Sequence, residues 1–333
     1  MKLILLSGGL GKRLWPLSTA DHPKQLLQIL EGPDGVAISM LQRVWRQLGQ
    51  VGVQSQTYIC ASKAQKEMIQ HQLGDITFVE EPEQRDTFPA IALASLYLLV
   101  DQEACSRDEV VTVAPIDHLV DDGYFRELAE LKRILDASGA EIALMGVKPT
   151  EPSSKFGYIQ LADAQGDRPW LLATSFVEKP EREAAAQLIQ SGALWNCGVF
   201  SFRLGFLVNV LKQNGYPASY EEAKRRFDRF PKRSFDYEVV EKARSIVVQP
   251  YSGKWKDLGT WDALAEQINT DLIGTGKAVQ CENTHIINEL GIPLIGMGLK
   301  NTIVVATPDG ILVADKSLSA NLNYAWGEPR KPY

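Results

Sequence analysis

A group of glycines and cations follows the first apolar run of the chain, and these residue types suit the binding of phosphate. The run 3–6 predicts a short buried strand. A glycine-rich backbone can then turn its N–H groups toward an anion, because no Cβ atom stands in the way. Arg and Lys side chains beside such a turn neutralise phosphate charge. The residues concerned are Gly8, Gly9, Gly11, Lys12, Arg13 and Lys24.

Two common nucleotide-binding patterns do not fit the spacing of this stretch. A dinucleotide fingerprint that starts at Gly9 would need a third glycine where Leu14 stands. A Walker A pattern that ends at Gly11 and Lys12 would need a glycine at Leu6. A dinucleotide-dependent oxidoreductase is therefore rejected. From the residues alone, the alternative to a phosphate-binding turn is an ordinary glycine turn after the first strand, which is common in α/β proteins.

Two aspartates could hold a divalent cation. Asp117 follows the β-branched run 110–114, and Asp257 lies in the segment 255–261. An Asp after a strand is well placed for Mg²⁺, which binds one or two carboxylates together with phosphates and waters. Each Asp taken alone is more typical of a turn or a cap than of a metal site, so the residues leave both interpretations open.

Glu178 and Lys179 stand directly before Pro180, at the end of a predicted strand. The carboxylate can accept hydrogen bonds from sugar hydroxyls, and the ammonium can neutralise a phosphate. A solvated pair before a helix that begins at Pro180 is the other interpretation, because proline is common at the first helical position.

The hydrophobic periodicity predicts strands alternating with helices. The predicted strands are 3–6, 57–60, 76–79, 110–114, 142–147, 155–161, 173–177, 196–202 and 246–249, and the predicted helices are 37–48, 62–72, 88–100, 123–137, 181–190, 203–213, 219–229, 235–243 and 261–268. Such an order indicates a parallel sheet covered by helices, with ligands bound beyond the carboxyl ends of the strands. From residue 277 to 315, short runs rich in Gly, Val and Ile predict a small β-appendage.

Several of these motifs together resemble the sugar-1-phosphate nucleotidyltransferases. The stretch G-G-x-G-x-R-L-W-P-L-S, followed by P-K-Q, resembles that family, and W-P-L-S resembles its mannose-1-phosphate guanylyltransferase branch. Further similar motifs are E-P-E-Q-R-D-T-F-P-A (81–90), P-I-D-H (115–118), F-G-Y-I (156–159), F-V-E-K-P (176–180), W-N-C-G-V-F (195–200), F-D-Y (235–237) and W-K-D-L-G-T-W (255–261).

The resemblance implies the fold and the division of the chain. It implies an α/β fold of the nucleotide-diphospho-sugar transferase type, with a Rossmann-like, mixed, mainly parallel sheet flanked by helices. Residues 1–268 would be the catalytic domain and 269–333 a small β-rich domain. For the appendage it suggests a truncated left-handed β-helix.

It also implies roles for individual residues. The catalytic residues would be Arg13, Lys24, Asp117 and Lys179. The nucleotide would be bound by Leu6, Ser7, Gly8, Gly9, Gly11, Lys12, Arg13, Arg85, Asp86, Thr87 and Pro89. The sugar phosphate would be bound by Gly157, Glu178, Lys179 and Asn196. Asp117 and Asp257 would hold Mg²⁺ or Mn²⁺.

The implied reaction transfers GMP from GTP to mannose 1-phosphate, with GTP and mannose 1-phosphate as binding partners. Asp86 stands where the family has Asn, and Cys197 where it has Ser. The same chemistry on another hexose 1-phosphate or nucleotide stays open, as does a non-catalytic regulatory homologue.

The composition limits which other binding partners and which cell compartment we expect. A net charge of −6 argues against general binding to nucleic acid, which is usually associated with a basic domain. Four dispersed cysteines, Cys60, Cys105, Cys197 and Cys281, are typical of free thiols in a reducing compartment. No stretch approaches the roughly 20 apolar residues of a membrane span. We expect a cytoplasmic protein without membrane contact, and leave a homodimer open.

Overall fold

The computed structural model describes residues 1–9, 11–19, 22–100, 106–163, 167–319 and 322. The chain packs as two compact units. The first unit comprises Met1–Gly8, Trp45–Ile116 and Val120–Trp255, and the second comprises Gly9–Val44, Asp117–Leu119 and Lys256–Tyr333. The predicted boundary after residue 268 divides the sequence at another point, and it stays a prediction about domains.

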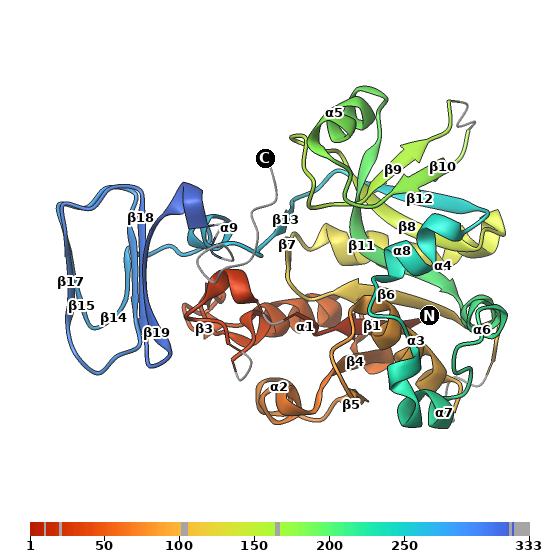
Figure 1. Ribbon diagram of the computed structural model, residues 1–333, viewed down its shortest axis with the longest axis horizontal. Helices are drawn as coiled ribbons and strands as arrows, with labels where there is room; N and C mark the ends of the chain where they lie inside the picture. Colours follow the sequence, from red (N-terminus) through yellow and green to blue (C-terminus); the bar gives the residue numbers. More distant parts are fainter. Residues whose placement is uncertain (10, 20–21, 101–105, 164–166, 320–321, 323–333) are drawn as a thin grey trace. The chain divides into compact units, whose positions relative to one another are not determined.

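A nine-stranded sheet forms the centre of the first unit (Figure 1). Its spatial order is β5-β4-β1-β6-β11-β8-β12-β10-β9. The strands are β1 (Lys2–Leu6), β4 (Thr57–Ser62), β5 (Thr77–Glu81), β6 (Val110–Pro115), β8 (Ile142–Val147), β9 (Tyr158–Leu161), β10 (Leu171–Val177), β11 (Leu194–Arg203) and β12 (Ile246–Tyr251). β10 and β11 run opposite to the other strands of this sheet, which share one direction. The predicted mixed, mainly parallel sheet is confirmed.

The strand sequences explain their places in this sheet. β8 is buried along its whole length, and β1 is buried except at Leu6. Strands covered on both faces are apolar in consecutive positions, which is the pattern in these two strands. Each strand predicted for this part of the chain overlaps an observed one.

Helices connect the strands of this sheet, and several of them pack against it. They are α1 (Met40–Gln50), which continues from the second unit into the first, α2 (Lys66–Leu73), α3 (Thr87–Leu98), α4 (Gly123–Ser138), α5 (Arg182–Gln190), α6 (Leu204–Gln213), α7 (Tyr220–Arg225) and α8 (Phe235–Glu238). Short 3-10 turns are η3 (Gln54–Gln56), η4 (Lys63–Gln65), η5 (Phe227–Arg229) and η6 (Val240–Lys242). Among the described residues, no helix has the length and apolar character needed to cross a membrane.

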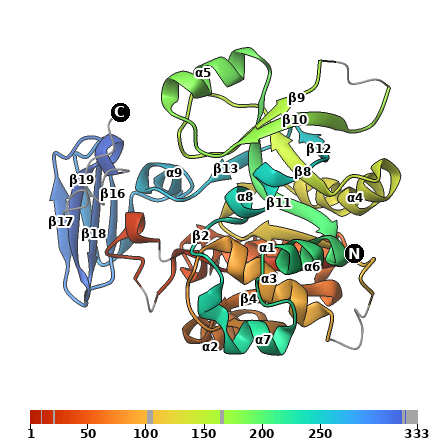
Figure 2. The ribbon, with the colours of Figure 1, turned by 45° about the vertical axis from the view of Figure 1, so that its right-hand side comes forward.

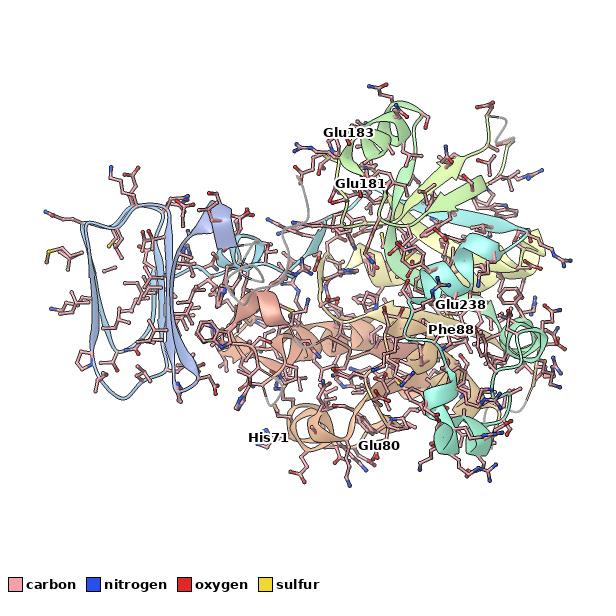
Figure 3. The ribbon with its side chains drawn as sticks, in the orientation of Figure 1. His71, Glu80, Phe88, Glu181, Glu183 and Glu238 are labelled. Atoms are coloured by element: carbon pink, nitrogen blue, oxygen red, sulfur yellow. The ribbon has the colours of Figure 1, made fainter. Side chains whose placement is uncertain are left out.

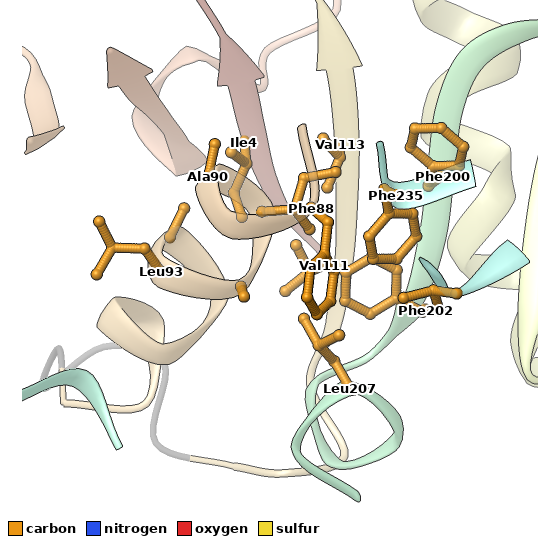
Figure 4. Packing of buried hydrophobic residues seen from close by; sticks show 14 of the residues in the cluster. Ile4, Phe88, Ala90, Leu93, Val111, Val113, Phe200, Phe202, Leu207 and Phe235 are labelled. Carbon is orange, nitrogen blue, oxygen red and sulfur yellow. The ribbon is translucent and has the colours of Figure 1, made fainter. Parts of the chain in front are cut away.

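The main core of the first unit lies between α3 and the sheet. Nearly every residue of α3 is buried, and its sequence accordingly has no polar face. The apolar run 88–100 predicts such a buried helix. Figure 4 shows this packing, with Phe88, Ala90 and Leu93 of α3 in one cluster with Ile4, Val111, Val113, Phe200, Phe202, Leu207 and Phe235.

Several predicted helices differ from the observed ones, and the helix over 261–268 ends already at Ala265. The helix over 219–229 is interrupted at Arg226, whose φ of −123° is not helical, and the helix over 235–243 is interrupted at Val239, with a φ of −125°. The helix over 37–48 begins only at Met40. Its predicted first residues, Ala37–Ile38, instead form β3, which pairs with β2 (Leu30–Glu31). Ser39 then accepts a hydrogen bond from the backbone of Gln42 at 3.1 Å and caps the helix.

The second unit ends in a coiled β-structure (Figure 1, Figure 2). Its strands are β14 (Leu272–Gly274), β15 (Gly276–Val279), β16 (His285–Asn288), β17 (Leu294–Met297), β18 (Thr302–Thr307) and β19 (Gly310–Asp315). Gly276 pairs in parallel with Leu294, His285 with Ile303, and Glu282 with Lys300, so each partner lies 18 residues further along the chain. One turn of 18 residues equals three sides of six, as in hexapeptide β-helices. The β-appendage is confirmed, while its left hand stays a prediction.

The glycine-rich segment shares a core with this coil. Leu14 and Leu17 belong to one buried cluster with Trp261, Ile287 and Val305. The other short elements of this unit are η1 (Lys12–Leu14), η2 (Lys24–Leu26) and α9 (Trp261–Ala265). Strands β7 (His118–Val120) and β13 (Trp255–Asp257) pair with each other, and the chain passes from one unit to the other within both.

Candidate functional site

The glycine-rich turn presents bare backbone. Leu6 ends β1, and the backbone N–H of Ser7 donates to the carbonyl of Cys60 at 3.0 Å. Gly8 and Gly9 are exposed, and no atom lies within 4 Å of where a Cβ of either would be. Gly9 has a φ of +93°, which L side chains rarely adopt. The turn therefore has the exposed glycine backbone that the sequence predicts, and its role in phosphate binding stays a prediction.

The other side of this turn is tightly packed. Gly11 has a φ of +58°, and a Cβ there would lie 3.0 Å from the Cβ of Lys24 and also against the Ser18 hydroxyl. Lys12 lies in η1, and its side chain is outside the part of the chain that the structure describes. Close packing of Gly11 fixes the distance between the turn and Lys24.

Lys24, Asp117, Asp257 and Arg13 form a charged group within the second unit. Lys24 is only 6% exposed, and its ammonium donates to Oδ2 of Asp117 at 2.6 Å. A Cβ on Gly259 would lie 3.1 Å from both carboxylate oxygens of Asp257 and 3.4 Å from Nη2 of Arg13. The backbone N–H of Leu258 donates to the carbonyl of Asp117 at 3.3 Å. The sequence predictions for these four residues thus converge on one place.

The charges in this group stabilise one another. Burial alone would raise the pKa of Asp117, but the charges of Lys24 and His118 and the Lys24 hydrogen bond hold it well below its usual range. Burial would lower the pKa of Lys24, yet Asp117 and Asp257 raise it above its usual value despite Arg13. Both partners therefore stay charged at neutral pH.

This group suits a divalent cation. Its donors are two carboxylates that both interact with one buried ammonium, and Gly259 leaves room beside the carboxylate of Asp257 that a side chain would fill. Hard cations such as Mg²⁺ prefer carboxylate oxygens and usually keep several waters. The donor set fits the predicted metal.

The segment Arg85–Thr87 is fastened from several sides. Arg85 donates to the carbonyls of Phe230 at 3.2 Å and Asp228 at 3.1 Å. Asp86 has a φ of +73°, and its carboxylate caps α3 by accepting from the N–H of Thr87 at 2.7 Å. The Thr87 hydroxyl accepts from the N–H of Phe235 at 2.9 Å, while Pro89 is buried. Arg85 thus holds a loop, and a direct contact of these residues with a base stays a prediction.

Gly157, Glu178 and Asn196 meet at the ends of β9, β10 and β11 in the first unit. A Cβ on Gly157 would lie 2.6 Å from Oε2 of Glu178 and against the ring of Phe176. The backbone N–H of Asn196 donates to the carbonyl of Gly157 at 2.8 Å. Only glycine lets the carboxylate come so close, so this close approach explains the glycine predicted for the sugar site.

Lys179 completes this second group. Its ammonium donates to Oε1 of Glu178 at 2.6 Å, and its own φ of +48° is rare outside glycine. The Lys179 side chain is 46% exposed, whereas that of Glu178 is 4% exposed. Strained backbone held in place by its surroundings is typical of functional sites.

Sequence reasoning assigned no role to Asp236, which lies beside these residues. Asn196 Nδ2 donates to Oδ1 of Asp236 at 2.8 Å, and Asn196 Oδ1 accepts from the N–H of Gly198 at 3.1 Å. The F-D-Y motif pointed to this position without saying what it does. Burial and the nearby charge of Glu178 raise the pKa of Asp236 to about 7. Burial likewise raises the pKa of Glu178, although Lys179 opposes the shift.

Comparisons with known proteins agree on one family. The profile described as "Nucleotidyl transferase" matches residues 2–273. The chain is 32% identical to the mannose-1-phosphate guanylyltransferase RfbM of Salmonella typhimurium, over 94% of this chain and 69% of that protein. It is also 32% identical to the alginate biosynthesis protein AlgA of Pseudomonas putida, over 94% of this chain and 68% of that protein.

A solved structure extends the similarity to the whole fold. The crystal structure described as a mannose-1-phosphate geranyltransferase from Thermus thermophilus superimposes with a TM-score of 0.78 and 27% sequence identity. The match covers 98% of each chain, so it includes the C-terminal coil as well as the large sheet.

Proposed function

The chain belongs to the nucleotidyl transferase family, and we propose that it transfers GMP from GTP to mannose 1-phosphate, giving GDP-mannose and pyrophosphate. Its similarity to a named mannose-1-phosphate guanylyltransferase over 94% of the chain supports this choice of substrates. The single observation that carries the proposal is the Lys24–Asp117–Asp257 group, which brings one buried ammonium and two carboxylates to the glycine-rich turn.

The reaction needs no general base. The second pKa of a phosphate monoester is about 6, so the sugar phosphate is largely a dianion at neutral pH. One of its oxygens attacks the α-phosphorus of the nucleotide and forms the new P–O bond. The bond between the α-phosphorus and the bridging oxygen breaks, and pyrophosphate leaves with that electron pair. Positioning and charge neutralisation can then supply most of the acceleration.

Each charged side chain takes one task in this scheme. Arg13 and the N–H groups of the glycine-rich turn hold the β- and γ-phosphates. Lys24 neutralises charge that develops at the α-phosphate, and Lys179 holds the sugar phosphate. Asp117 and Asp257 would hold Mg²⁺, or Mn²⁺, which would supply further positive charge to the phosphates.

The sugar is recognised by the group around Gly157. The Glu178 carboxylate accepts hydrogen bonds from sugar hydroxyls, and the close approach allowed by Gly157 keeps it in place. Asn196 holds the neighbouring carboxyl of Asp236 and contributes its remaining hydrogen-bonding capacity to the sugar. Guanine is held by the segment with Arg85, Asp86, Thr87 and Pro89, where the carboxylate of Asp86 can accept from the N–H groups of the base.

The setting of the reaction is also part of the proposal. We place the protein in the cytoplasm, which agrees with the free thiols of Cys60, Cys197 and Cys281; Cys105 lies outside the described residues. A homodimer is proposed on the exposed apolar side chains of the C-terminal coil, which include Ile295 and Met297 of β17.

A substrate panel tests the proposal. Purified protein with Mg²⁺ is given GTP, ATP, UTP or dTTP together with mannose, glucose or fucose 1-phosphate, and pyrophosphate release is measured. We expect the highest kcat/KM with GTP and mannose 1-phosphate. A preference for another pair would keep the chemistry and reject these substrates, and no release with any pair would favour a non-catalytic homologue.

A further inference from the structure

The residues around Gly157, namely Glu178, Lys179, Asn196 and Asp236, are called the sugar group from here on. Its carboxyls share one ammonium, that of Lys179. Glu178 from the end of β10 and Asp236 from α8 both interact with the ammonium of Lys179. Glu241 of η6 accepts from the backbone N–H of Glu178 at 3.1 Å, which brings a third carboxylate to the same place. An excess of carboxyls around one ammonium favours keeping a proton on one of them.

The position of Asp236 is fixed. Asn196 donates to one oxygen of Asp236 and is itself held by the N–H of Gly198. This hydrogen bond restrains the Asp236 carboxyl, on which the charge of Glu178 acts. Like-charged carboxyls held close together cannot both ionise freely.

The charged and titratable groups that act on this pair lie at the end of β10, at the start of α3, on α8 and on η6. Asp86, at the start of α3, adds negative charge near Glu178, and Glu241 does so from η6. Tyr237, next to Asp236 on α8, donates its hydroxyl to the carbonyl of Glu178 at 3.5 Å. Burial and the negative charge of Glu178 raise the pKa of Tyr237, so it stays neutral. Lys179 is the cation that acts on both carboxyls.

We propose that binding of the sugar phosphate is accompanied by uptake of one proton, which the Glu178–Asp236 pair holds in the bound state. This inference rests on the proposed function, since it assigns the sugar phosphate to this group. The proton comes from the buffer, and no covalent bond of the substrate changes in the step. The carboxyl that holds it becomes a hydrogen-bond donor, so the pocket can both donate to and accept from sugar hydroxyls.

Electrostatic repulsion between the bound phosphate and the two carboxyls couples ligand binding to proton uptake. A phosphate dianion at Lys179 adds negative charge beside the two carboxyls and draws on the ammonium that Glu178 now binds at 2.6 Å. Both changes increase the proton affinity of the pair. Because linkage is reciprocal, a proton on the pair must increase the affinity for the sugar phosphate by the same factor.

The direction of the pH effect follows. The pKa of Asp236 is already raised to about 7 without substrate, and a bound dianion raises it further. Affinity for the sugar phosphate should therefore decline as the pH rises above about 7, and the decline should approach about tenfold per pH unit where a full proton is coupled. Below pH 6 the ligand itself loses its second charge, which weakens binding for a separate reason.

Calorimetry measures the proton directly. Mannose 1-phosphate is titrated into the wild-type protein at pH 7.5 in buffers of different ionisation enthalpy, and the dependence of the observed heat on the buffer gives the number of protons taken up. We expect an uptake between about one half and one proton for the wild type. D236N should show almost none, because Asn resembles a protonated Asp and can still accept from Asn196.

Affinity provides the second readout. At pH 8, D236N should bind mannose 1-phosphate about three- to tenfold more tightly than the wild type, and its affinity should change little between pH 7 and 8. The matched control is E183Q, which removes an exposed carboxylate from α5, labelled in Figure 3, and should match the wild type in both respects.

The outcomes separate this inference from the proposed function. Binding without proton uptake in the wild type, or equal uptake in the wild type and D236N, would overturn the inference. If D236N does not fold, the wild-type uptake and its absence in E178Q decide. If the wild type binds glucose 1-phosphate and not mannose 1-phosphate, the sugar assignment fails and the proton measurement is made with glucose 1-phosphate.

Discussion

The group around Lys24 and the group around Lys179 use the same residue types with opposite results. In the second unit, Lys24 is buried against Asp117, and the pKa of that carboxyl is held well below its usual range. In the first unit, Lys179 contacts Glu178, yet the pKa values of Glu178 and Asp236 are both raised. A close Lys–carboxylate pair alone therefore does not determine the protonation state.

The difference arises from the surroundings of each pair. Asp117 is close to the ammonium of Lys24 and to His118, whereas Lys179 acts on both Glu178 and Asp236 and its side chain is 46% exposed. In both groups burial disfavours the charged form of the carboxyls. Only in the Lys24 group do the neighbouring charges compensate fully for this cost. The Lys24 group therefore suits permanent charge, and the Lys179 group suits uptake of a proton from solvent when a ligand binds.

The largest effect is expected from removing the buried ammonium. Lys24→Met should lower the free energy of unfolding by about 2–3 kcal/mol, less than for a fully buried pair because the Asp117 side chain is 26% exposed. It should also lower kcat by about 10²–10³-fold, since a positioned positive charge is lost. Urea unfolding and pyrophosphate release measure the two effects.

The control for this change is Lys277→Met, which removes an exposed ammonium from β15 and should leave both quantities unchanged. Wild-type stability in Lys24→Met would show that the ion pair does not compensate for the burial of its charges. The contrast with Lys179 would then lose its basis.

A second prediction concerns the sugar group. Gly157→Ala places a Cβ 2.6 Å from Glu178 Oε2, so the carboxylate must move. We expect the KM for mannose 1-phosphate to rise about tenfold, by analogy with the few kcal/mol that overpacking costs, with the KM for GTP unchanged. Steady-state kinetics with each substrate varied in turn measures both values.

Gly291→Ala is the matched control, because no atom lies within 4 Å of its added Cβ. An equal rise in both KM values for Gly157→Ala would indicate general damage and would count against a separate sugar group.

The third prediction uses the pH dependence of stability. The pKa of Asp236 is raised in the folded protein, so the folded state binds the proton more tightly than the unfolded state, and stability falls as the pH rises from about 4 to about 7. Asp236→Asn should remove this loss and raise the free energy of unfolding by about 1–2 kcal/mol at pH 8, with little change near pH 4. Urea unfolding at both pH values measures it.

Asp117 should behave in the opposite way. Its pKa is lowered on folding, so its contribution is complete above about pH 4 and is lost only as the pH falls through the lower folded value. An equal gain at pH 4 and pH 8 for Asp236→Asn would contradict the assigned protonation of the sugar group.

The smallest effect concerns the support of the glycine-rich turn by the C-terminal coil. The Thr307 hydroxyl donates to the carbonyl of Pro16 at 3.3 Å, and both residues are buried. Thr307→Val should cost about 1 kcal/mol and raise the KM for GTP about two- to threefold.

Thr302→Val provides the comparison. It removes a hydroxyl on the same strand that donates to the carbonyl of Lys300 at 2.7 Å, with no link to the turn. A change in the KM for GTP in both variants would mean that the coil affects the turn through its stability alone.

Much of the fold could be predicted from the sequence because its signals are local. Strands such as Ile142–Val147 are continuous apolar runs, and the buried helix α3 lacks a polar face. The breaks at Arg226 and Val239 could not be predicted, since no proline or glycine marks them and tertiary packing overrides local propensity there.

The candidate site shows the same limit. The motifs identified Lys24, Asp117 and Glu178, but the contact that fixes Asp236 comes from Asn196, 40 residues away in the chain. Arg85 is a similar case, because the carbonyls that it binds, those of Asp228 and Phe230, lie more than 140 residues further on. Single-sequence patterns carry no record of such long-range contacts.

The most direct test of the account is the formation of GDP-mannose from GTP and mannose 1-phosphate by the wild type and by Asp117→Asn. We predict product from the wild type and a kcat lower by about 10²–10³-fold in the variant, because the carboxylate paired with Lys24 is lost. Asp34→Asn, in an exposed turn, should match the wild type. Undiminished product formation by Asp117→Asn would contradict the role assigned to the Lys24–Asp117–Asp257 group.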